Sequence, residues 1–373
     1  MKVLHIITGL SNGGAEAVLY RLCKYDKPTR HIVVSLTSEG KYGSLLKVEG
    51  VDVFCLNLTP GKFSISALWR LFQFIRKQKP DIVQTWMYHA DLIGGIVARL
   101  AGVKNLYWNI RHSNLVEGQS KRATMLVAKI CAKLSRFVPR KIICCAYTAV
   151  NVHVALGYKK HKMIVIGNGY DLTDFYPSIE HKAAFKKELN LSDQVLLGMV
   201  GRFDPQKDHF GLLKSIELLD SSFDNFKVAL IGNGLNLANR PLVNKIKEYG
   251  LESRIVLLDQ RIDIFVVMNG LDIHILSSGF GEAFPNVLAE AMACGTPCVA
   301  TDVGDAAFII DNTGWVVPPA DYLALSHSLL AAIKELEDHP AQWSLRGALC
   351  RQRIESNFSI EKMINKYHKA WSE

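Results

Sequence analysis

The sequence contains no hydrophobic run that could cross a membrane, because no segment reaches the roughly 18 apolar residues that a spanning helix needs. The apolar segment that opens the chain is short and is interrupted by His5 and Gly9, so it does not look like a secretory signal. We therefore expect a cytoplasmic protein that is soluble or held peripherally at a membrane.

A disulfide framework and a zinc-binding pattern are absent as well. The eight cysteines are scattered, and no histidines accompany them at the spacing of a zinc site. Only Cys144 with Cys145, and Cys294 with Cys298, lie close together in the sequence. We expect buried, reduced cysteines, as in a reducing compartment, and no bound metal.

Signals for nucleic-acid binding are missing, although the chain has a formal net charge of +9 at pH 7. Residues 1–167 carry 25 Lys and Arg against 8 Asp and Glu, a balance of +17, whereas residues 168–373 carry 19 against 27, a balance of −8. There is no zinc finger, RNA-binding motif or long basic tail, which argues against nucleic acid. The basic half suggests an anionic partner instead, such as membrane lipid or a ligand with a diphosphate.

The main positive feature of the sequence is a regular alternation of short β-branched runs with helical patterns. This alternation predicts an α/β fold of parallel sheets covered by helices on both faces. The rhythm stops at the turn-rich segment 167–171 and restarts near Val195, which indicates two domains. The expected strands are 2–8, 31–37, 51–58, 81–86, 104–110, 140–146 and 162–166, then 195–201, 226–231, 254–258, 272–277 and 297–301. The expected helices include 14–25, 64–79, 90–102, 120–136 and a wholly helical C-terminal segment, 341–371.

Residues that follow the strands are the candidates for ligand binding, because ligands of open parallel sheets bind beyond the carboxyl ends of the strands. After the first strand, Gly13 and Gly14 precede a helix, where backbone N–H groups could approach an anion closely; a plain tight turn explains them equally well. After the strand that opens the second series, Arg202 and Lys207 stand at the start of a helix. Two cations there suit a diphosphate leaving group, and a pair of solvated surface charges is the alternative.

The most informative segment runs from 277 to 297. A strand leads into a loop that contains Glu282, and a helix begins near Pro285, a residue that suits a first helical turn. Glu290 lies on that helix among apolar neighbours, a setting that disfavours a carboxylate without a partner. An acid that merely complements the helix dipole is the alternative.

Taken together, these segments resemble glycosyltransferase family 4, a family of retaining enzymes with the GT-B fold. The matching features are Gly13-Gly14, the segment from Gly201-Arg202 to Lys207, the pair Glu282 and Glu290 with seven residues between them, and the interdomain turn 168–171. Two positions depart from the family pattern, since Ala283 replaces the usual glycine and Asn233 stands where an aspartate is common. Ala283 should be tolerated if its φ is negative.

The resemblance implies two Rossmann-like domains, 1–170 and 171–355, that face each other across a cleft. It also implies that a C-terminal helix, 356–373, returns to the first domain. The donor would be a nucleotide-diphosphate sugar, favoured as a UDP-sugar by the habit of the family. No cofactor and no metal are expected, in keeping with the lack of any Asp-x-Asp motif.

The resemblance assigns roles to the motif residues. Glu290 would bind the ribose hydroxyls of the donor, and Glu282 would bind hydroxyls of the transferred sugar. Arg202 and Lys207 would hold the diphosphate, with Gly13 and Gly14 opposite. The loop and first turn that would cradle the sugar and the phosphate comprise Ala283, Phe284, Pro285, Asn286 and Val287, of which Pro285 has no N–H to donate.

The first half offers further candidates. His89 follows a strand and opens a helix, and it resembles the donor-proximal histidine of the family; with Glu282, Arg202 and Lys207 it completes the expected catalytic group. Arg111 and His112 also follow a strand and are expected to meet the acceptor. The stretch 120–141 is basic and amphipathic, which fits either a helix packed on the sheet or a helix at an anionic membrane surface.

We therefore expect a retaining hexosyltransferase that transfers a sugar to a saccharide acceptor linked to polyprenyl diphosphate, in bacterial O-antigen, capsule or exopolysaccharide synthesis. It would work in the cytoplasm, peripherally at the inner face of the plasma membrane. One alternative is a transferase of the same fold for a soluble glucan or small molecule. A nicotinamide-dependent enzyme is less favoured, because G-x-G-x-x-G does not follow the first strand. A catalytically silent binding protein is the last alternative.

Overall fold

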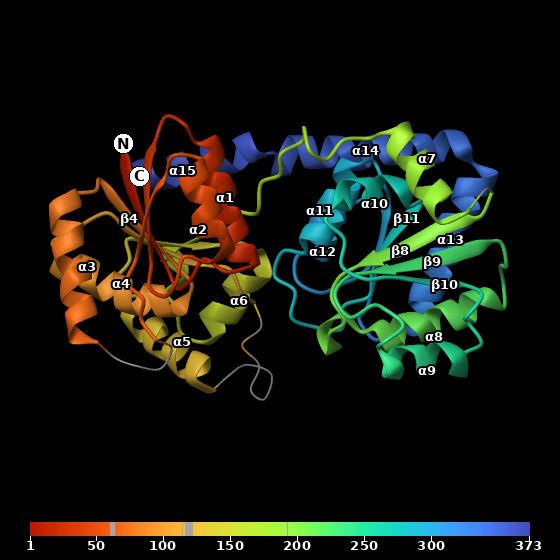
Figure 1. The fold of residues 1–373 in the computed structure, drawn as a ribbon, viewed down its shortest axis with the longest axis horizontal. Helices are drawn as coiled ribbons and strands as arrows, with labels where there is room; N and C mark the ends of the chain where they lie inside the picture. Colours follow the sequence, from red (N-terminus) through yellow and green to blue (C-terminus); the bar gives the residue numbers. More distant parts are fainter. Residues whose placement is uncertain (60–63, 114, 116–121, 192) are drawn as a thin grey trace. The chain divides into compact units, whose positions relative to one another are not determined.

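The computed structural model describes residues 1–59, 64–113, 115, 122–191 and 193–373, which form two compact units (Figure 1). The N-terminal unit consists of Met1–Gly169 together with Ile360–Glu373, and the C-terminal unit consists of Tyr170–Ser359. Each unit is built around its own parallel sheet, so the expected restart of the strand rhythm is confirmed.

The sheet of the N-terminal unit has seven parallel strands in the order β3-β2-β1-β4-β5-β6-β7. Its strands are β1 (Lys2–Ile7), β2 (Arg30–Ser35), β3 (Asp52–Cys55), β4 (Ile82–Trp86), β5 (Leu106–Ile110), β6 (Lys141–Cys144) and β7 (Met163–Val165). The central strands β4 and β5 are buried along their whole length, as in a sheet covered on both faces, although they include the polar residues Gln84, Thr85 and Asn109.

Helices of the N-terminal unit fall into two groups that cover the sheet (Figure 1). They are α1 (Gly14–Tyr25), α2 (Gly40–Val48), α3 (Ile65–Gln78), α4 (Tyr88–Leu100), α5 (Arg122–Leu134), α6 (Tyr147–Ala155), a 3-10 turn (Lys160–Lys162) and the C-terminal α15 (Ile360–Ser372). Helix α1 packs against α2 and α15, whereas α4 packs between α3 and α5. The return of the last helix to the first unit is thus confirmed.

The sheet of the C-terminal unit has six parallel strands in the order β10-β9-β8-β11-β12-β13. Its strands are β8 (Val195–Val200), β9 (Phe226–Ile231), β10 (Ile255–Leu258), β11 (Ile273–Leu276), β12 (Cys298–Thr301) and β13 (Trp315–Val317). Strand β13 was not expected, because three residues are too few to show a periodic pattern.

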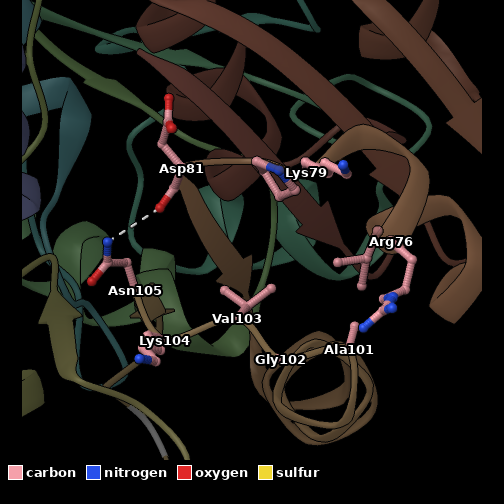
Figure 2. Close-up of a pocket in the computed structure, with 10 residues that line it drawn as sticks. Arg76, Lys79, Asp81, Ala101, Gly102, Val103, Lys104 and Asn105 are labelled. Atoms are coloured by element: carbon pink, nitrogen blue, oxygen red, sulfur yellow. Dashed lines mark hydrogen bonds between the residues drawn. The ribbon is translucent and has the colours of Figure 1, made fainter.

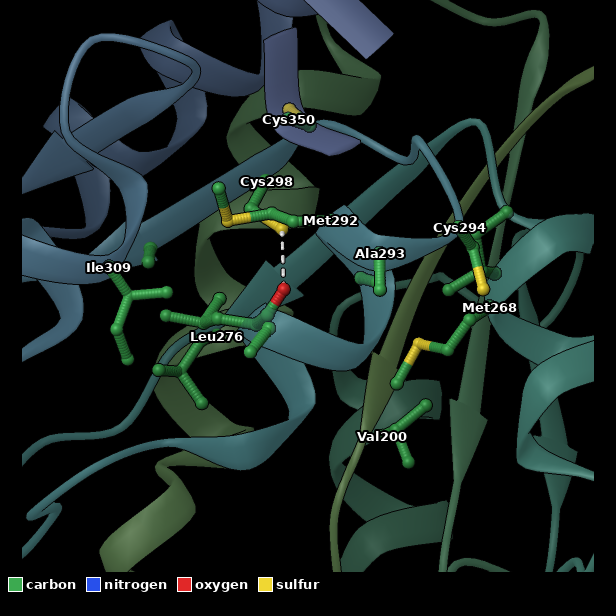
Figure 3. Packing of buried hydrophobic residues seen from close by; sticks show 14 of the residues in the cluster. Val200, Met268, Leu276, Met292, Ala293, Cys294, Cys298, Ile309 and Cys350 are labelled. Carbon is green, nitrogen blue, oxygen red and sulfur yellow. Dashed lines mark hydrogen bonds between the residues drawn. The ribbon is translucent and has the colours of Figure 1, made fainter. Parts of the chain in front are cut away.

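Helices of this unit complete the fold and carry the chain back. They are α7 (Ile179–Glu188), a 3-10 turn (Pro205–Lys207), α8 (His209–Asp220), α9 (Arg240–Glu248), α10 (Ile264–Gly270), α11 (Asn286–Ala293), α12 (Ala306–Ile310), α13 (Tyr322–Asp338) and α14 (Pro340–Phe358). Ser359, with an extended ψ of 157°, separates α14 from α15, so the last helix begins at Ile360, close to the expected start at 356. Met292 of α11, Cys298 of β12, Ile309 of α12 and Cys350 of α14 belong to one apolar core with Leu276 of β11 (Figure 3).

Both sheets reverse their strand order once, and this reversal locates the candidate site. The strand order runs outward from β1 in one direction through β2 and β3, and in the other from β4 onward. The C-terminal sheet reverses in the same way between β8 and β11. In open parallel sheets, ligands bind beyond the carboxyl ends of the two strands that flank such a reversal.

A buried polar network fastens α15 to the N-terminal sheet. Trp86 Nε1 donates to His5 Nδ1 at 3.1 Å, and His5 Nε2 lies 3.0 Å from His31 Nδ1. Asp26 lies 3.2 Å from His31 and accepts a bond from His368 of α15 at 2.8 Å. Burial alone would raise the pKa of Asp26, but hydrogen bonds from His31, His368 and a neighbouring threonine lower it to about 2.

All eight cysteines are free in the structure, and all but Cys55 are buried as expected. Among the described residues, no helix combines the length and the apolar character that crossing a bilayer requires.

Candidate active site

The loop after β8 carries the two cations expected to bind diphosphate. Asp204 shapes this loop, because its side chain accepts the Gln206 N–H at 2.9 Å and caps the following 3-10 turn. Arg202 Nε lies 3.0 Å from Asp204 Oδ2, and the Arg202 side chain is mostly exposed. The guanidinium therefore stands at the surface with most of its donors directed to solvent.

Lys207 and Glu282, predicted from separate motifs, meet in the C-terminal unit. Lys207 Nζ donates to Glu282 Oε1 at 2.6 Å, and the two side chains are only 11% and 10% exposed. Ser278 Oγ donates to the same carboxylate oxygen at 2.7 Å. A buried ion pair of this kind needs such additional hydrogen bonds, since desolvation would otherwise offset the Coulomb attraction.

The loops after β8 and β11 are also tied through their backbones. Ser277 Oγ donates to the Lys207 carbonyl at 2.8 Å, and the Gly279 N–H donates to the Gln206 carbonyl at 2.9 Å. Because β8 and β11 are the strands at the reversal of this sheet, these bonds fix the two motif loops side by side where a ligand is expected.

Gly304, which follows strand β12, lies in close contact with the loop that contains Glu282. Gly304 has φ +68°, and a Cβ on it would lie 2.7 Å from the carbonyl oxygens of Glu282 and Ala283. The Ala283 carbonyl accepts the Asp305 N–H at 2.9 Å. Gly281 has φ +78°, whereas Ala283 does not adopt a positive φ, so the departure from the family glycine is accommodated.

Helix α11 presents the remaining residues of the expected donor cradle. Phe284 and Pro285 are buried at its entry, and Asn286 and Val287 form its partly buried first turn. Glu290 lies one turn further along and is also partly buried, among the buried apolar residues that precede and follow it on the helix. Burial, and then the charge of Glu290, raise the pKa of the Cys294 thiol to about 12.

Strand β9 brings a third loop to the same edge of the sheet. A Cβ on Gly232, which has φ +148°, would lie 2.2 Å from the Gly201 carbonyl oxygen. The Phe203 N–H donates to the Asn233 carbonyl at 2.8 Å. Asn233 therefore holds the loop of Arg202 through its backbone, a contribution that does not depend on the aspartate common in the family.

Two histidines are buried close to Lys207. Burial and then the Lys207 charge lower the pKa of His274 to about 3, and the same causes lower that of His209 to about 4. Within the described residues, no ring nitrogen of either histidine has a hydrogen-bond partner. Both rings are therefore neutral near pH 7.

The glycine pair lies at the reversal of the N-terminal sheet, after β1. Gly13 caps α1 with an extended backbone, φ −152°, and Gly14 is the exposed first residue of the helix. A Cβ on Gly14 would meet no atom within 4 Å, so the space beside it is open. Glu16 occupies the same first turn, and burial raises the pKa of its carboxyl.

His89 follows β4, the other strand at the reversal, and lies in the first turn of α4. The preceding Met87 has φ +73° and ψ 157°, a strained conformation for a residue with a side chain. Asp91 of the same helical turn is fully buried and accepts a bond from Thr85. Burial lowers the pKa of His89, so the imidazole is neutral near pH 7.

Arg111 and His112 follow β5, the next strand. Arg111 Nη2 donates to Asn168 Oδ1 in the interdomain turn, and its guanidinium carbon lies 5.9 Å from the centroid of the Trp86 ring. His112 is partly buried. The Arg111 side chain therefore has a structural partner in addition to any ligand.

A group of three potential metal ligands lies in the core of the N-terminal unit. The ligand atoms of His5, Cys23 and His31 all lie within 4.8 Å of one another. Their chemistry does not favour a metal, because the histidine nitrogens already bond to each other and burial raises the pKa of the Cys23 thiol well above its usual value.

Two cavities lie away from the carboxyl ends of the strands. A cavity of about 440 Å³ in the N-terminal unit lies where β4 and β5 begin, at the end of the strands opposite to the candidate site residues (Figure 2). Arg76, Lys79 and Lys104 line it, together with Asn105, whose Nδ2 donates to the Asp81 carbonyl. A second cavity, of about 660 Å³, lies in the C-terminal unit between α7 and α14.

The structure thus joins Lys207 to Glu282 and places Arg202 on the loop of Lys207. It places Gly13, Gly14, His89, Arg111 and His112 after neighbouring strands of the other unit. Sequence reasoning missed Ser278 and Gly304, which support Glu282 and its loop. A serine before a glycine-rich loop gives no signal of its own, whereas a glycine after a strand, such as Gly304, was a visible cue. The roles of all these residues stay predictions.

Comparison with known proteins gives matches along most of the chain. Residues 12–174 match the family model described as Glycosyltransferase Family 4, and residues 181–348 match the model described as Glycosyl transferases group 1. The Escherichia coli UDP-Gal:alpha-D-GlcNAc-diphosphoundecaprenol alpha-1,3-galactosyltransferase is 26% identical over 322 residues, which cover 85% of this chain and 81% of that protein.

Two further similarities cover almost the whole length. The capsular polysaccharide biosynthesis glycosyltransferase CapM of Staphylococcus aureus is 25% identical over 354 residues, with 91% of this chain and 90% of that protein covered. The crystal structure of Anabaena Alr3699/HepE in complex with UDP matches over 100% of both chains with a TM-score of 0.86 and 21% identity. At this identity the structural match concerns the fold alone.

Proposed function

Because the chain is a glycosyltransferase that belongs to family 4 and has the GT-B fold, we propose that it is a retaining enzyme whose donor is a UDP-sugar. The observation that carries the proposal is the largely buried Lys207–Glu282 pair at the reversal of the C-terminal sheet. The E. coli relative is named for a UDP-Gal donor, and the HepE structure holds UDP, which supports the choice of nucleotide.

The proposed mechanism rests on charge placed for the leaving diphosphate. Lys207 and Arg202 neutralise the negative charge that develops on the leaving phosphate oxygens, aided by the N-terminal end of α11. Glu282 keeps Lys207 in position and accepts hydrogen bonds from the transferred sugar, while Glu290 binds the ribose. Without a covalent nucleophile, the acceptor hydroxyl attacks from the face that the diphosphate leaves: its oxygen bonds to the anomeric carbon as the bond to the phosphate oxygen breaks, and its proton passes to that leaving oxygen. Since the sequence has no Asp-x-Asp, we assign this neutralisation to protein cations and not to a metal.

A panel of nucleotide sugars tests this proposal directly. The purified protein is incubated with each donor and an extracted lipid-linked acceptor fraction, and both the released nucleotide and the anomeric configuration of the product are measured. We expect release of UDP from one UDP-sugar, with retention of configuration and full activity in the presence of a chelator. Inversion, or release only with another nucleotide, would contradict the donor and the stereochemistry that we propose.

We propose that the acceptor is a saccharide linked to polyprenyl diphosphate, used in bacterial surface-polysaccharide assembly. The E. coli relative is named for a diphosphoundecaprenol acceptor, and CapM for capsular polysaccharide. The N-terminal unit carries 28 Lys and Arg against 10 Asp and Glu, a charge of +18 that attracts an anionic acceptor. His89, Arg111 and His112 lie at the strand ends where its diphosphate or sugar would bind.

The outer surface of α3, α4 and α5 supports peripheral attachment to an anionic membrane. The three helices pack side by side, with α4 between α3 and α5. Large apolar side chains are exposed on each helix or just after it. They are Ile65, Trp69, Ile96, Leu100, Leu126, Ile130 and Phe137. Exposed cations surround them, namely Arg70, Arg76, Lys77, Lys129, Lys133 and Arg136. The described residues of α3 and α5 include no Asp or Glu.

This surface, which we call the basic apolar face, includes most of the amphipathic stretch 120–141, whose first two residues lie outside the described part. The combination of exposed apolar side chains with cations fits binding in the headgroup region, where each cation contributes about 1 kcal/mol. The location would be the cytoplasmic face of the plasma membrane.

Vesicle sedimentation tests the membrane part of the proposal. Replacing Trp69, Leu126 and Phe137 by serine should abolish binding to vesicles that contain phosphatidylglycerol at moderate salt, while activity on a water-soluble acceptor is retained. The matched control replaces the equally exposed Leu237, Ile262 and Leu323 of the C-terminal unit by serine, and this control should bind as the wild type does. Wild-type protein that stays in the supernatant would favour a soluble glucan or small-molecule acceptor.

A further inference from the structure

Tyr170 occupies the point where the chain enters the C-terminal unit. It is the first residue of that unit, and Ser359, with which it forms an isolated parallel β-bridge, is the last. The Tyr170 N–H donates to the Phe358 carbonyl at 2.9 Å. Both crossings between the units therefore lie side by side at Tyr170.

The Tyr170 side chain extends from this crossing into the proposed donor site. It is fully buried, and its hydroxyl donates to Asn286 Oδ1 at 2.6 Å. Its ring stacks against Phe284, with the ring centroids 6.5 Å apart and the planes at 25°. One side chain thus contacts the residue before Pro285 and the residue that begins α11.

The hydroxyl contributes something that the ring does not. A phenylalanine would fill the same space against Phe284, but a buried hydroxyl requires a partner, and here the partner is the side chain of Asn286. An asparagine accepts through Oδ1 and donates through Nδ2, so the bond also determines which end of this amide faces Tyr170. The orientation of the first turn of α11 is thereby fixed.

We propose that Tyr170 is a positioning residue for the nucleotide-sugar donor and acts through Asn286. The inference rests on the proposed function, in which the first turn of α11 binds the donor. Tyr170 need not touch the ligand; it holds Asn286 and the N-terminal turn in the geometry that the donor requires, and it links that geometry to the crossing segments. Its loss should therefore affect donor binding and leave acceptor binding unchanged.

Titration calorimetry with UDP tests the proposal on the full-length protein. Tyr170→Phe keeps the ring and removes one hydroxyl, and we expect the Kd for UDP to rise about tenfold, the equivalent of one buried hydrogen bond. The donor KM should rise by a similar factor while the acceptor KM stays within twofold. The variant should fold normally, because the ring packing is kept.

The N-terminal unit offers a matched control. Tyr367 is also fully buried, and its hydroxyl accepts a bond from Asn109 Nδ2 at 2.9 Å. Tyr367→Phe removes a comparable tyrosine–asparagine bond outside the proposed donor site, so it should lower the melting temperature without changing the Kd for UDP.

A double-mutant cycle completes the test. In the background of Asn286→Ala, the further change Tyr170→Phe should have no additional effect on UDP binding, because the path through Asn286 is already lost. Equal Kd values for wild type and Tyr170→Phe, or equal losses in both tyrosine variants, would overturn the positioning role. Wild-type protein that does not bind UDP at all would instead refute the proposed function itself.

Discussion

The two units share one architecture and differ in what they place at the reversal of the sheet. In the C-terminal unit, β8 and β11 bring together a buried lysine, a glutamate and a serine that already bond to one another. In the N-terminal unit, β1 leads to an exposed Gly14 with open space beside it, and β4 leads to the neutral His89. The first arrangement is preorganised before a ligand arrives, and the second leaves room for one.

The two units also differ in formal charge. The N-terminal unit has a formal charge of +18, whereas the C-terminal unit has 16 Lys and Arg against 25 Asp and Glu, a charge of −9. An acidic unit that binds a diphosphate must therefore concentrate positive charge locally, and Arg202 and Lys207 supply two cations on one loop, with Glu282 keeping Lys207 in place. The basic unit has no such need, because its overall field already attracts anions.

The largest expected effect concerns Lys207. Lys207→Ala should lower kcat/KM for sugar transfer by roughly 100- to 1,000-fold, as removal of one electrostatic donor does in other enzymes. The measurement is UDP release at saturating acceptor, with melting temperature followed in parallel. Lys214→Ala, at an exposed position on α8, is the control and should retain activity. Retention of more than a tenth of wild-type activity in Lys207→Ala would remove the preorganised cation from the account.

A second prediction isolates the close approach that shapes the Glu282 loop. Gly304→Ala and Gly250→Ala share a positive φ, +68° and +67°, but a Cβ on Gly250 meets nothing within 4 Å. Gly304→Ala should therefore destabilise the protein by roughly 1 to 3 kcal/mol more than Gly250→Ala, as overpacking does. Only Gly304→Ala should also weaken UDP binding. Denaturant unfolding and titration calorimetry measure the two effects, and equal behaviour of the variants would contradict the role of the contact.

A third prediction follows from four fully buried histidines with lowered pKa values, two in the described part of each unit. The pKa values of His274, His209 and His153 are about 3, 4 and 4, chiefly because of burial, and that of His5 is also well below its usual value. Their folded-state pKa values are below the unfolded value near 6.5, so the stabilisation is complete above pH 6.5. It is lost as the pH falls toward 4, by roughly 1.4 kcal/mol per pH unit for each histidine.

Replacing one of these histidines should change the pH dependence of stability in one unit and leave it unchanged in the other. His274→Leu removes one of the two groups in the C-terminal unit, so the acid-induced loss of stability should become shallower there and remain unchanged in the N-terminal unit. Hydrogen exchange measured peptide by peptide between pH 4 and 7 reports on each unit by itself. An unchanged pH dependence in the C-terminal unit would show that His274 does not take up a proton on unfolding.

The sequence alone predicts the fold to a large extent, because each strand and helix has a local signal. The βαβ rhythm locates nearly every strand, and the short strand β13, which has no period, is missed. Lys207 and Glu282 are predicted for a different reason, since each lies in a motif that can be read within a few residues.

The supporting contacts could not be predicted, because they join residues that are far apart in the chain. Tyr170 meets Asn286 across 116 positions, and His368 meets Asp26 across 342. Ser278 lies only four residues from Glu282, but which neighbour bonds to the carboxylate depends on how the loop turns.

A crystal structure of this protein with UDP tests the central claim most directly. The account predicts that the diphosphate lies at the carboxyl ends of β8 and β11, with its oxygens within hydrogen-bond distance of Lys207 and Arg202, and that the ribose hydroxyls bond to Glu290. UDP bound at any other place on the C-terminal unit, with the Lys207–Glu282 pair undisturbed and solvent beside it, would contradict the account.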